Sequence, residues 1–168
     1  MFDRFGEFDS AEELNRKAAE LDAAGDTEGV YALASENGID KEDAEDYLHG
    51  DVDKLATPLM AATGKLAVES THLDIGGILK DWKDIVVGIC TEDARMCEAV
   101  RKKEKSLKGC MAAIIKYSFE NKVRVNDRIV DEVKVVHNGK TEQMRKPLYL
   151  GVPDRTQTKS IVTDYYMK

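Results

Sequence analysis

Apolar residues recur every three or four positions along most of this chain, which is the period of an α-helix. A Ser10–Glu13 capping box opens a helix over residues 11–24. A second helix follows from a Thr27 cap, and a third runs over residues 40–48, with Asn-Gly or Gly after each. The pattern predicts three short helices at the start of the chain.

The rest of the chain is also expected to be largely helical. A Thr-Pro pair, an amphipathic stripe with the only tryptophan, and further Thr, Ser and Asp caps mark five helix starts. These helices are expected to begin at Pro58, Ile78, Thr91, Ser106 and Asp154. The helix after Ser106 has a wide apolar face, so we expect it to be central, with the last helix packed on it.

The segment IVDEVKVV, residues 129–136, fits two structures. Its apolar spacing is typical of a helix, whereas the Asn138-Gly139 pair after it is typical of a β-hairpin turn. We favour the helix and keep the hairpin as the alternative. The segment PLYLGVP, residues 147–153, is bounded by prolines and is expected to be extended, as an edge strand or a connector.

These elements predict a mainly α protein. An acidic helical module over residues 1–70 is followed by a linker over 71–77 and a helical domain over 78–168, with at most a minor β-hairpin or extended segment. The length of 168 residues suits one domain with a helical appendage. No apolar run has the length of a membrane helix, and the first residues lack the basic start of a secretory signal. We therefore expect a cytoplasmic protein.

Charge is unevenly distributed, although the net charge of the chain is −7. Residues 1–60 hold 17 acidic and 5 basic side chains, whereas residues 61–168 hold 15 acidic and 20 basic ones. The acidic part is either a solvated surface or a face for a basic partner, because arginines that hold phosphates also hold carboxylates. In the second interpretation the contact residues are Glu12, Glu13, Glu20, Glu42, Asp43, Glu45 and Asp46.

Residue patterns for catalysis or metal binding are missing. Cys90, Cys97 and Cys110 form no paired metal motif, and Cys110 lies within an apolar helix face. The histidines are scattered, and the chain has no phosphate-binding glycine loop or nucleophile motif. The acidic run after residue 39 lacks the ligand spacing of an EF-hand. We therefore expect a non-enzymatic protein without a metal or cofactor.

The second half resembles the PcfK-like family of conjugative plasmids and transposons. The resemblance covers about residues 78–168 and is carried by the segments TEDARMCEAV, KSLKGCMAAIIKY and SIVTDYYMK. Its positions are a lysine, a cysteine and three tyrosines: Lys105, Cys110, Tyr117, Tyr165 and Tyr166. Asp164 stands where the family has a histidine before the tyrosine pair. The family includes anti-CRISPR proteins, so the resemblance implies an inhibitor that binds a type II RNA-guided Cas nuclease.

Three functions are therefore compared. The first is this anti-CRISPR inhibitor, which would place the acidic module in the positive nucleic-acid channel of the nuclease. The second is an accessory binding module of conjugation or of plasmid or transposon maintenance. Its contacts with nucleic acid would be Arg101, Lys102, Lys103, Lys105 and Lys108. The third is a self-associating protein whose aromatic tail, Tyr165 and Tyr166, forms a homodimer. We favour the first.

Overall fold

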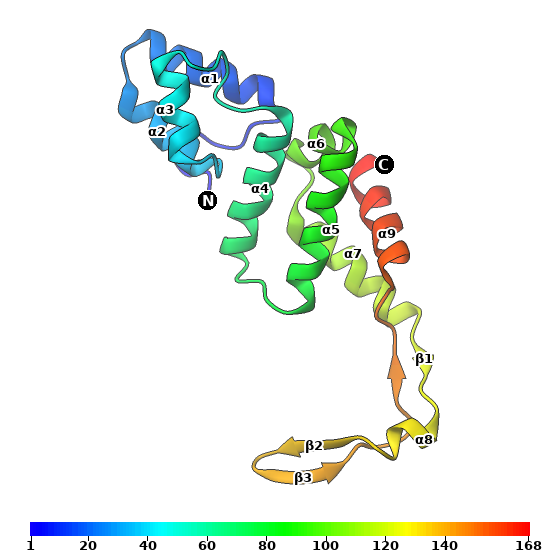
Figure 1. Ribbon diagram of the computed structural model, residues 1–168. Helices are drawn as coiled ribbons and strands as arrows, with labels where there is room; N and C mark the ends of the chain where they lie inside the picture. Colours follow the sequence, from blue (N-terminus) through cyan, green and yellow to red (C-terminus); the bar gives the residue numbers. More distant parts are fainter.

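Nine helices and two small antiparallel sheets make up the computed structural model, which describes residues 1–168 (Figure 1). The helices are α1 (Ala11–Ala23), α2 (Thr27–Glu36), α3 (Lys41–His49), α4 (Pro58–His72), α5 (Ile78–Glu92), α6 (Ala94–Arg101), α7 (Leu107–Glu120), α8 (Asp127–Val130) and α9 (Arg155–Met167). The strands are β1 (Val123–Arg124), β2 (Lys134–His137), β3 (Lys140–Gln143) and β4 (Tyr149–Leu150). The mainly α fold with minor β structure is confirmed.

Most helix starts lie where the capping residues predict them. The side chains of Ser10, Thr57 and Ser106 each accept a backbone N–H from the first turn of their helices. Two starts differ by one or two residues from the prediction. Asp26, and not Thr27, caps α2, and α6 is capped by Asp93 because α5 continues to Glu92. These shifts do not change the order of the elements.

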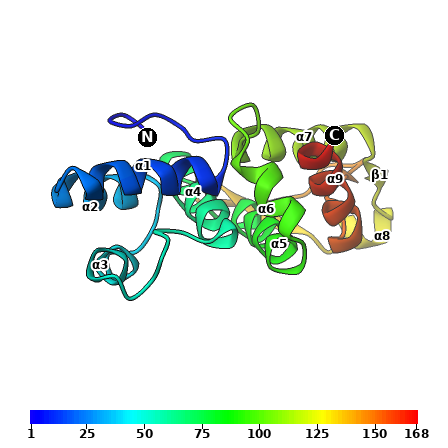
Figure 2. The ribbon, with the colours of Figure 1, turned by 90° about the horizontal axis from the view of Figure 1, so that it is seen from above.

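Two apolar cores share one helix, α4. Figure 2 shows α4 between α1–α3 on one side and the other helices on the opposite side. The first core is formed by α1–α3 with the start of α4, and includes Leu14, Leu33 and Ala61. The second is formed by α4–α7 and α9, and we call these five helices the bundle. Since α4 contributes to both cores, the acidic module and the bundle are joined by packing as well as by sequence. The expected linker, residues 71–77, covers the last two residues of α4 and the turn to α5.

Residues 122–153 leave the bundle as an extended arm (Figure 1). The short β1–β4 ribbon leads to α8 and then to the β2–β3 hairpin. The helix favoured for residues 129–136 is wrong, because α8 ends at Val130 and a hairpin follows. Asn138 and Gly139 both have positive φ, at 51° and 74°, so their left-handed turn decides the structure over the apolar spacing.

Candidate partner-binding surfaces

The seven predicted acidic residues lie on two helices that α2 separates. Glu12 and Glu13 are in the first turn of α1, and Glu20 is near the other end of that helix. The other four, Glu42, Asp43, Glu45 and Asp46, lie on α3. Figure 2 shows α3 set apart from α1 at the outer end of the molecule. The structure therefore does not bring all seven together, and the largest group is the α3 acidic surface, defined as those four residues.

Some of these carboxylates are already engaged within the protein. Glu13 accepts the backbone N–H of Asp9 at 2.9 Å, which completes the start of α1. Glu20 pairs with Lys17 at 3.1 Å. Glu45 pairs with Lys41 at 2.8 Å, and this hydrogen bond lowers the pKa of the Glu45 carboxyl. These three are less available to a partner than the remaining four.

The unpaired acids of α3 adjoin further acids that the sequence analysis did not select. Asp43 and Asp46 line a hollow of about 290 Å³ together with Asp53 from the α3–α4 loop. No Lys or Arg side chain forms an ion pair with these three carboxylates. Val52, an exposed apolar residue, lines the same hollow. The acidic loop directly after Gly50 was the signal in the sequence that could have extended the predicted surface.

The predicted basic stretch is divided between the surface and the interior. Lys102, Lys103 and Lys108 are exposed in or next to the α6–α7 loop. Lys105 is half-buried, and its Nζ lies 5.2 Å from the centre of the Tyr165 ring. Arg101 is only 1% exposed. Its guanidinium donates to the carbonyls of Ala61 and Phe8 and to Asn37 Oδ1, at 3.2, 3.0 and 3.3 Å. Arg101 therefore joins the acidic module to the bundle and is not a surface contact.

A second buried cation lies at the same junction. The Lys65 ammonium donates to the carbonyls of Lys102 and Lys105, at 2.8 and 2.9 Å, and pairs with Glu7. Glu69, one turn later on α4, accepts the backbone N–H of Leu107 at 2.7 Å. Burial raises the pKa of the Glu69 carboxyl, while the Leu107 bond and Lys65 oppose that rise. Sequence reasoning missed this network because its members are far apart in the chain.

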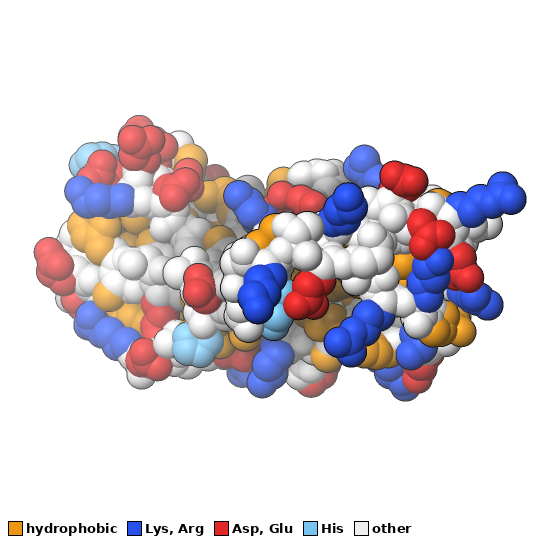
Figure 3. All heavy atoms as spheres, turned by 90° about the horizontal axis from the view of Figure 1, so that it is seen from below, with side chains coloured by type: hydrophobic (Ala, Val, Ile, Leu, Met, Phe, Trp, Pro, Cys, Tyr) orange, Lys and Arg blue, Asp and Glu red, His pale blue; other side chains and the backbone are white.

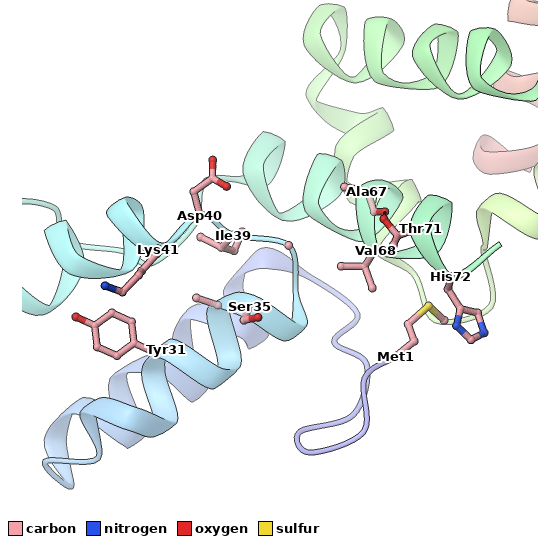
Figure 4. Close-up of a pocket in the computed structure, with 12 residues that line it drawn as sticks. Met1, Tyr31, Ser35, Ile39, Asp40, Lys41, Ala67, Val68, Thr71 and His72 are labelled. Carbon is pink, nitrogen blue, oxygen red and sulfur yellow. Dashed lines mark hydrogen bonds between the residues drawn. The ribbon is translucent and has the colours of Figure 1, made fainter. Parts of the chain in front are cut away.

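A groove opens between α4 and the pair formed by α2 and the turn after it (Figure 4). Its volume is about 760 Å³. Ser35 and Ile39 lie opposite Val68, Tyr31 and Lys41 lie at one end of the groove, and His72 lies at the other. The lining is half apolar, so the groove can receive apolar side chains from a partner. We call it the α2–α4 groove.

The aromatic tail is not an exposed surface. Tyr166 is 3% exposed and belongs to the core of the bundle, where α9 packs on α7 as expected. The Tyr165 hydroxyl accepts the backbone N–H of Ser106 at 3.1 Å. A homodimer through an exposed tyrosine pair is therefore excluded in this conformation.

The remaining features concern thiols, metals and membranes. All three cysteines are buried, and burial raises the pKa of Cys110 to about 12. No three His, Cys, Asp or Glu side chains are placed to hold a metal ion together. None of the helices has both the length and the apolar character needed to cross a membrane.

Comparisons with known proteins give no match: no family model, no curated protein and no solved structure is significantly similar to this chain.

Proposed function

We propose that the protein is a non-enzymatic anti-CRISPR inhibitor that binds a type II RNA-guided Cas nuclease through the α3 acidic surface. The observation that supports this most is the exposure of that surface with few internal cations. Glu42 and Asp46 are exposed, and neither forms an ion pair with a Lys or Arg. A partner with a positive channel can therefore contact them without first breaking ion pairs of this protein.

The charge of the acidic module supports the same partner class. Residues 1–60 carry 17 acidic and 5 basic side chains, and the nuclease holds its nucleic acid in a positively charged channel. Figure 3 shows several acidic side chains with a few basic ones at the module end of the molecule, and more lysines and arginines among the acids over the centre and the opposite end. The electrostatic field of this uneven charge distribution speeds association with a basic surface and orients the protein as it approaches that surface.

The test is plasmid cleavage by the purified nuclease and its guide RNA, with and without this protein, at low and moderate salt. Wild-type protein is expected to inhibit, and inhibition is expected to weaken as salt screens the charges. The variant Glu42→Lys/Asp46→Lys should lose at least about tenfold in inhibitory potency, since reversal replaces attraction by repulsion. Full cleavage in a large excess of wild-type protein would remove the proposal for that nuclease.

A matched control separates local contact from net charge. Glu98→Lys/Glu104→Lys makes the same change in charge at exposed positions of the bundle side. This control should inhibit within about twofold of wild type when the α3 surface makes the contact. Equal losses in both variants would indicate a non-specific charge effect and contradict the assigned surface. Circular dichroism of each variant checks that the helices remain folded.

A second candidate function is nucleic-acid binding in conjugation or in plasmid or transposon maintenance. It is favoured by one observation, the exposure of Lys102, Lys103 and Lys108 around a single loop. A gel-shift assay with Lys102→Glu/Lys103→Glu as the comparison tests it. Binding of wild-type protein that is lost in this variant would support the second function over the first.

A further inference from the structure

The arm, residues 122–153, is the least buried part of the protein. Only Val130 and Pro153 are buried within it, and its two sheets have two strands each. Two-stranded ribbons are marginally stable in water unless another surface packs on them. Both edges of each ribbon also lack a strand neighbour, which leaves backbone groups available for a partner. The arm therefore has the features of a segment that packs on another molecule.

Exposed apolar side chains are concentrated on this arm. About a fifth of the chain carries seven of the fourteen large hydrophobic residues that are exposed: Val123, Ile129, Val135, Val136, Tyr149, Leu150 and Val152. Val136, near the hairpin tip, is 74% exposed. Val123 and Leu150 are paired across β1 and β4, so they lie on one face. A concentration of exposed apolar side chains on one segment favours contact with another surface.

The charge of the arm indicates the kind of partner. The arm has seven Lys or Arg and four Asp or Glu residues, in a chain whose net charge is −7. Nucleic acid would have to approach a protein that is acidic as a whole, which lowers its affinity for phosphates. A second copy also has a net charge of −7, but its acidic residues are concentrated in the acidic module, which therefore offers the arm a surface of opposite charge.

The same module also offers a place for the apolar residues of the arm. The α2–α4 groove is open, has a volume of about 760 Å³ and is lined in part by Tyr31, Ile39 and Val68. Its own rim has mixed charge, with Asp40 beside Lys41, so the attraction comes from the module as a whole. The arm lacks an apolar surface to pack on, and apart from Met1 at the His72 end no residue from outside α2, the turn after it, the start of α3 and α4 lines the groove.

We propose that the protein forms a two-fold dimer in which the hairpin of each copy, with Val136 at its centre, docks in the α2–α4 groove of the other. The exchange is reciprocal, because each copy gives one arm and receives one arm. Both arms and both grooves are then occupied, so no third copy can add to the dimer. The dimer does not depend on the proposed inhibition of a nuclease. Its test needs no nuclease, and either proposal can fail while the other stands.

The measurement is the mass in solution, by sedimentation equilibrium, over a range of protein and salt concentrations. Wild-type protein is expected to reach twice the 18.7 kDa of the chain and to dissociate more readily at high salt. Val136→Glu should weaken the dimer at least about tenfold, because a carboxylate would be buried beside an acidic module. Met167→Glu changes an exposed apolar residue outside the arm and the groove, and should dimerise like wild type.

Two further variants test the partner surface. Ala67→Trp fills the groove from an exposed position of α4 and should also give a monomer, while Ala19→Trp on α1 should not. Replacing residues 126–147 by Asn-Gly joins β1 to β4 in a short turn and removes the hairpin, which should abolish the dimer. This variant keeps every residue of both cores.

Other outcomes overturn the proposal in distinct ways. A wild-type protein that stays at the mass of one chain at every concentration contradicts the dimer. If Val136→Glu is monomeric while Ala67→Trp still dimerises, the arm packs on another surface, such as the second arm. If wild type is monomeric and Lys134→Glu/Lys140→Glu loses a DNA gel shift, the arm binds nucleic acid instead.

Discussion

Lys65 and Glu69 lie one turn apart on α4, and both are buried while reaching the same loop. The Lys65 ammonium donates to the carbonyls of Lys102 and Lys105, and the Glu69 carboxylate accepts the N–H of Leu107. These bonds hold the loop between α6 and α7 to α4, the helix that both cores share. The position of the exposed lysines on that loop therefore depends on a buried pair of opposite charges.

Replacing Lys65 tests how much this network stabilises the protein. Lys65→Met keeps most of the side-chain length but leaves two carbonyls and the Glu7 carboxylate without their donor. Breaking a buried pair in this way costs several kcal/mol, so we expect the free energy of unfolding to fall by about 3 kcal/mol. Urea denaturation followed by circular dichroism measures the change.

Lys80→Met is the matched control, because Lys80 is exposed and forms no ion pair. Its free energy of unfolding should stay within about 0.5 kcal/mol of wild type. Equal effects of the two substitutions would mean that the buried network adds nothing to stability.

Glu69 gives stability a pH dependence whose sign follows from its burial. The pKa of Glu69 is raised above the ordinary 4.5, chiefly by desolvation, so the folded state binds the proton more tightly than the unfolded state. The contribution of Glu69 to stability should therefore fall as pH rises from about 4.5 through the raised pKa. Glu69→Gln keeps an acceptor for Leu107 and cannot ionise, so it should gain stability relative to wild type over that range.

Denaturation midpoints of wild type and Glu69→Gln, measured from about pH 4 to pH 8, give the difference directly. Glu104→Gln, at an exposed position, is the control and should follow wild type throughout. A difference between wild type and Glu69→Gln that shrinks with rising pH would contradict the predicted sign.

Gly64 allows α4 to approach the turn after α2. A Cβ atom at Gly64 would overlap the carbonyl oxygen of Asn37, whose side chain in turn holds Arg101. Gly64→Ala should therefore lower the free energy of unfolding by about 1–3 kcal/mol, despite the better helix propensity of alanine. Gly88→Ala, in α5 with open space around it, should instead stabilise by about 0.5–1 kcal/mol. Thermal melts that rank the two variants in the reverse order would show that the contact is not tight.

Local signals in the sequence predict most of the fold. Ser10, Thr57 and Ser106 mark their helices correctly because a cap acts through backbone groups two or three residues away. The hairpin is also encoded locally, in the left-handed turn at Asn138-Gly139, although the apolar spacing before it is typical of a helix. An apolar period of three to four over only eight residues is weak evidence for a helix when those apolar residues are exposed, as Val136 is.

The candidate surfaces were harder to predict, because burial depends on tertiary packing. Arg101 begins a basic run that resembles a solvated helix end, yet it is buried against residues 37 and 61. Nothing in the nearby sequence identifies those partners. Conversely, Glu42 and Asp46 of α3 are exposed, as charge alone predicts, whereas Asp43 and Glu45 are half-buried. Charge density along the chain therefore does not distinguish an exposed basic residue from a buried one such as Arg101.

The cysteines should be inert while the protein is folded. Burial raises the pKa of Cys90 and Cys110 to about 12, and it also raises that of Cys97, which donates a hydrogen bond to the Cys90 carbonyl. At pH 8 a thiol with a pKa of 12 is ionised to about one part in ten thousand, and only the thiolate reacts with a disulfide reagent. We therefore expect none of the three to react rapidly with Ellman's reagent in native protein, and all three to react in guanidinium.

Ala112→Cys places a thiol at an exposed position of α7 and should add one fast-reacting group. Rapid reaction of a native cysteine would show that the bundle opens readily, because both accessibility and ionisation must change for the thiolate to form.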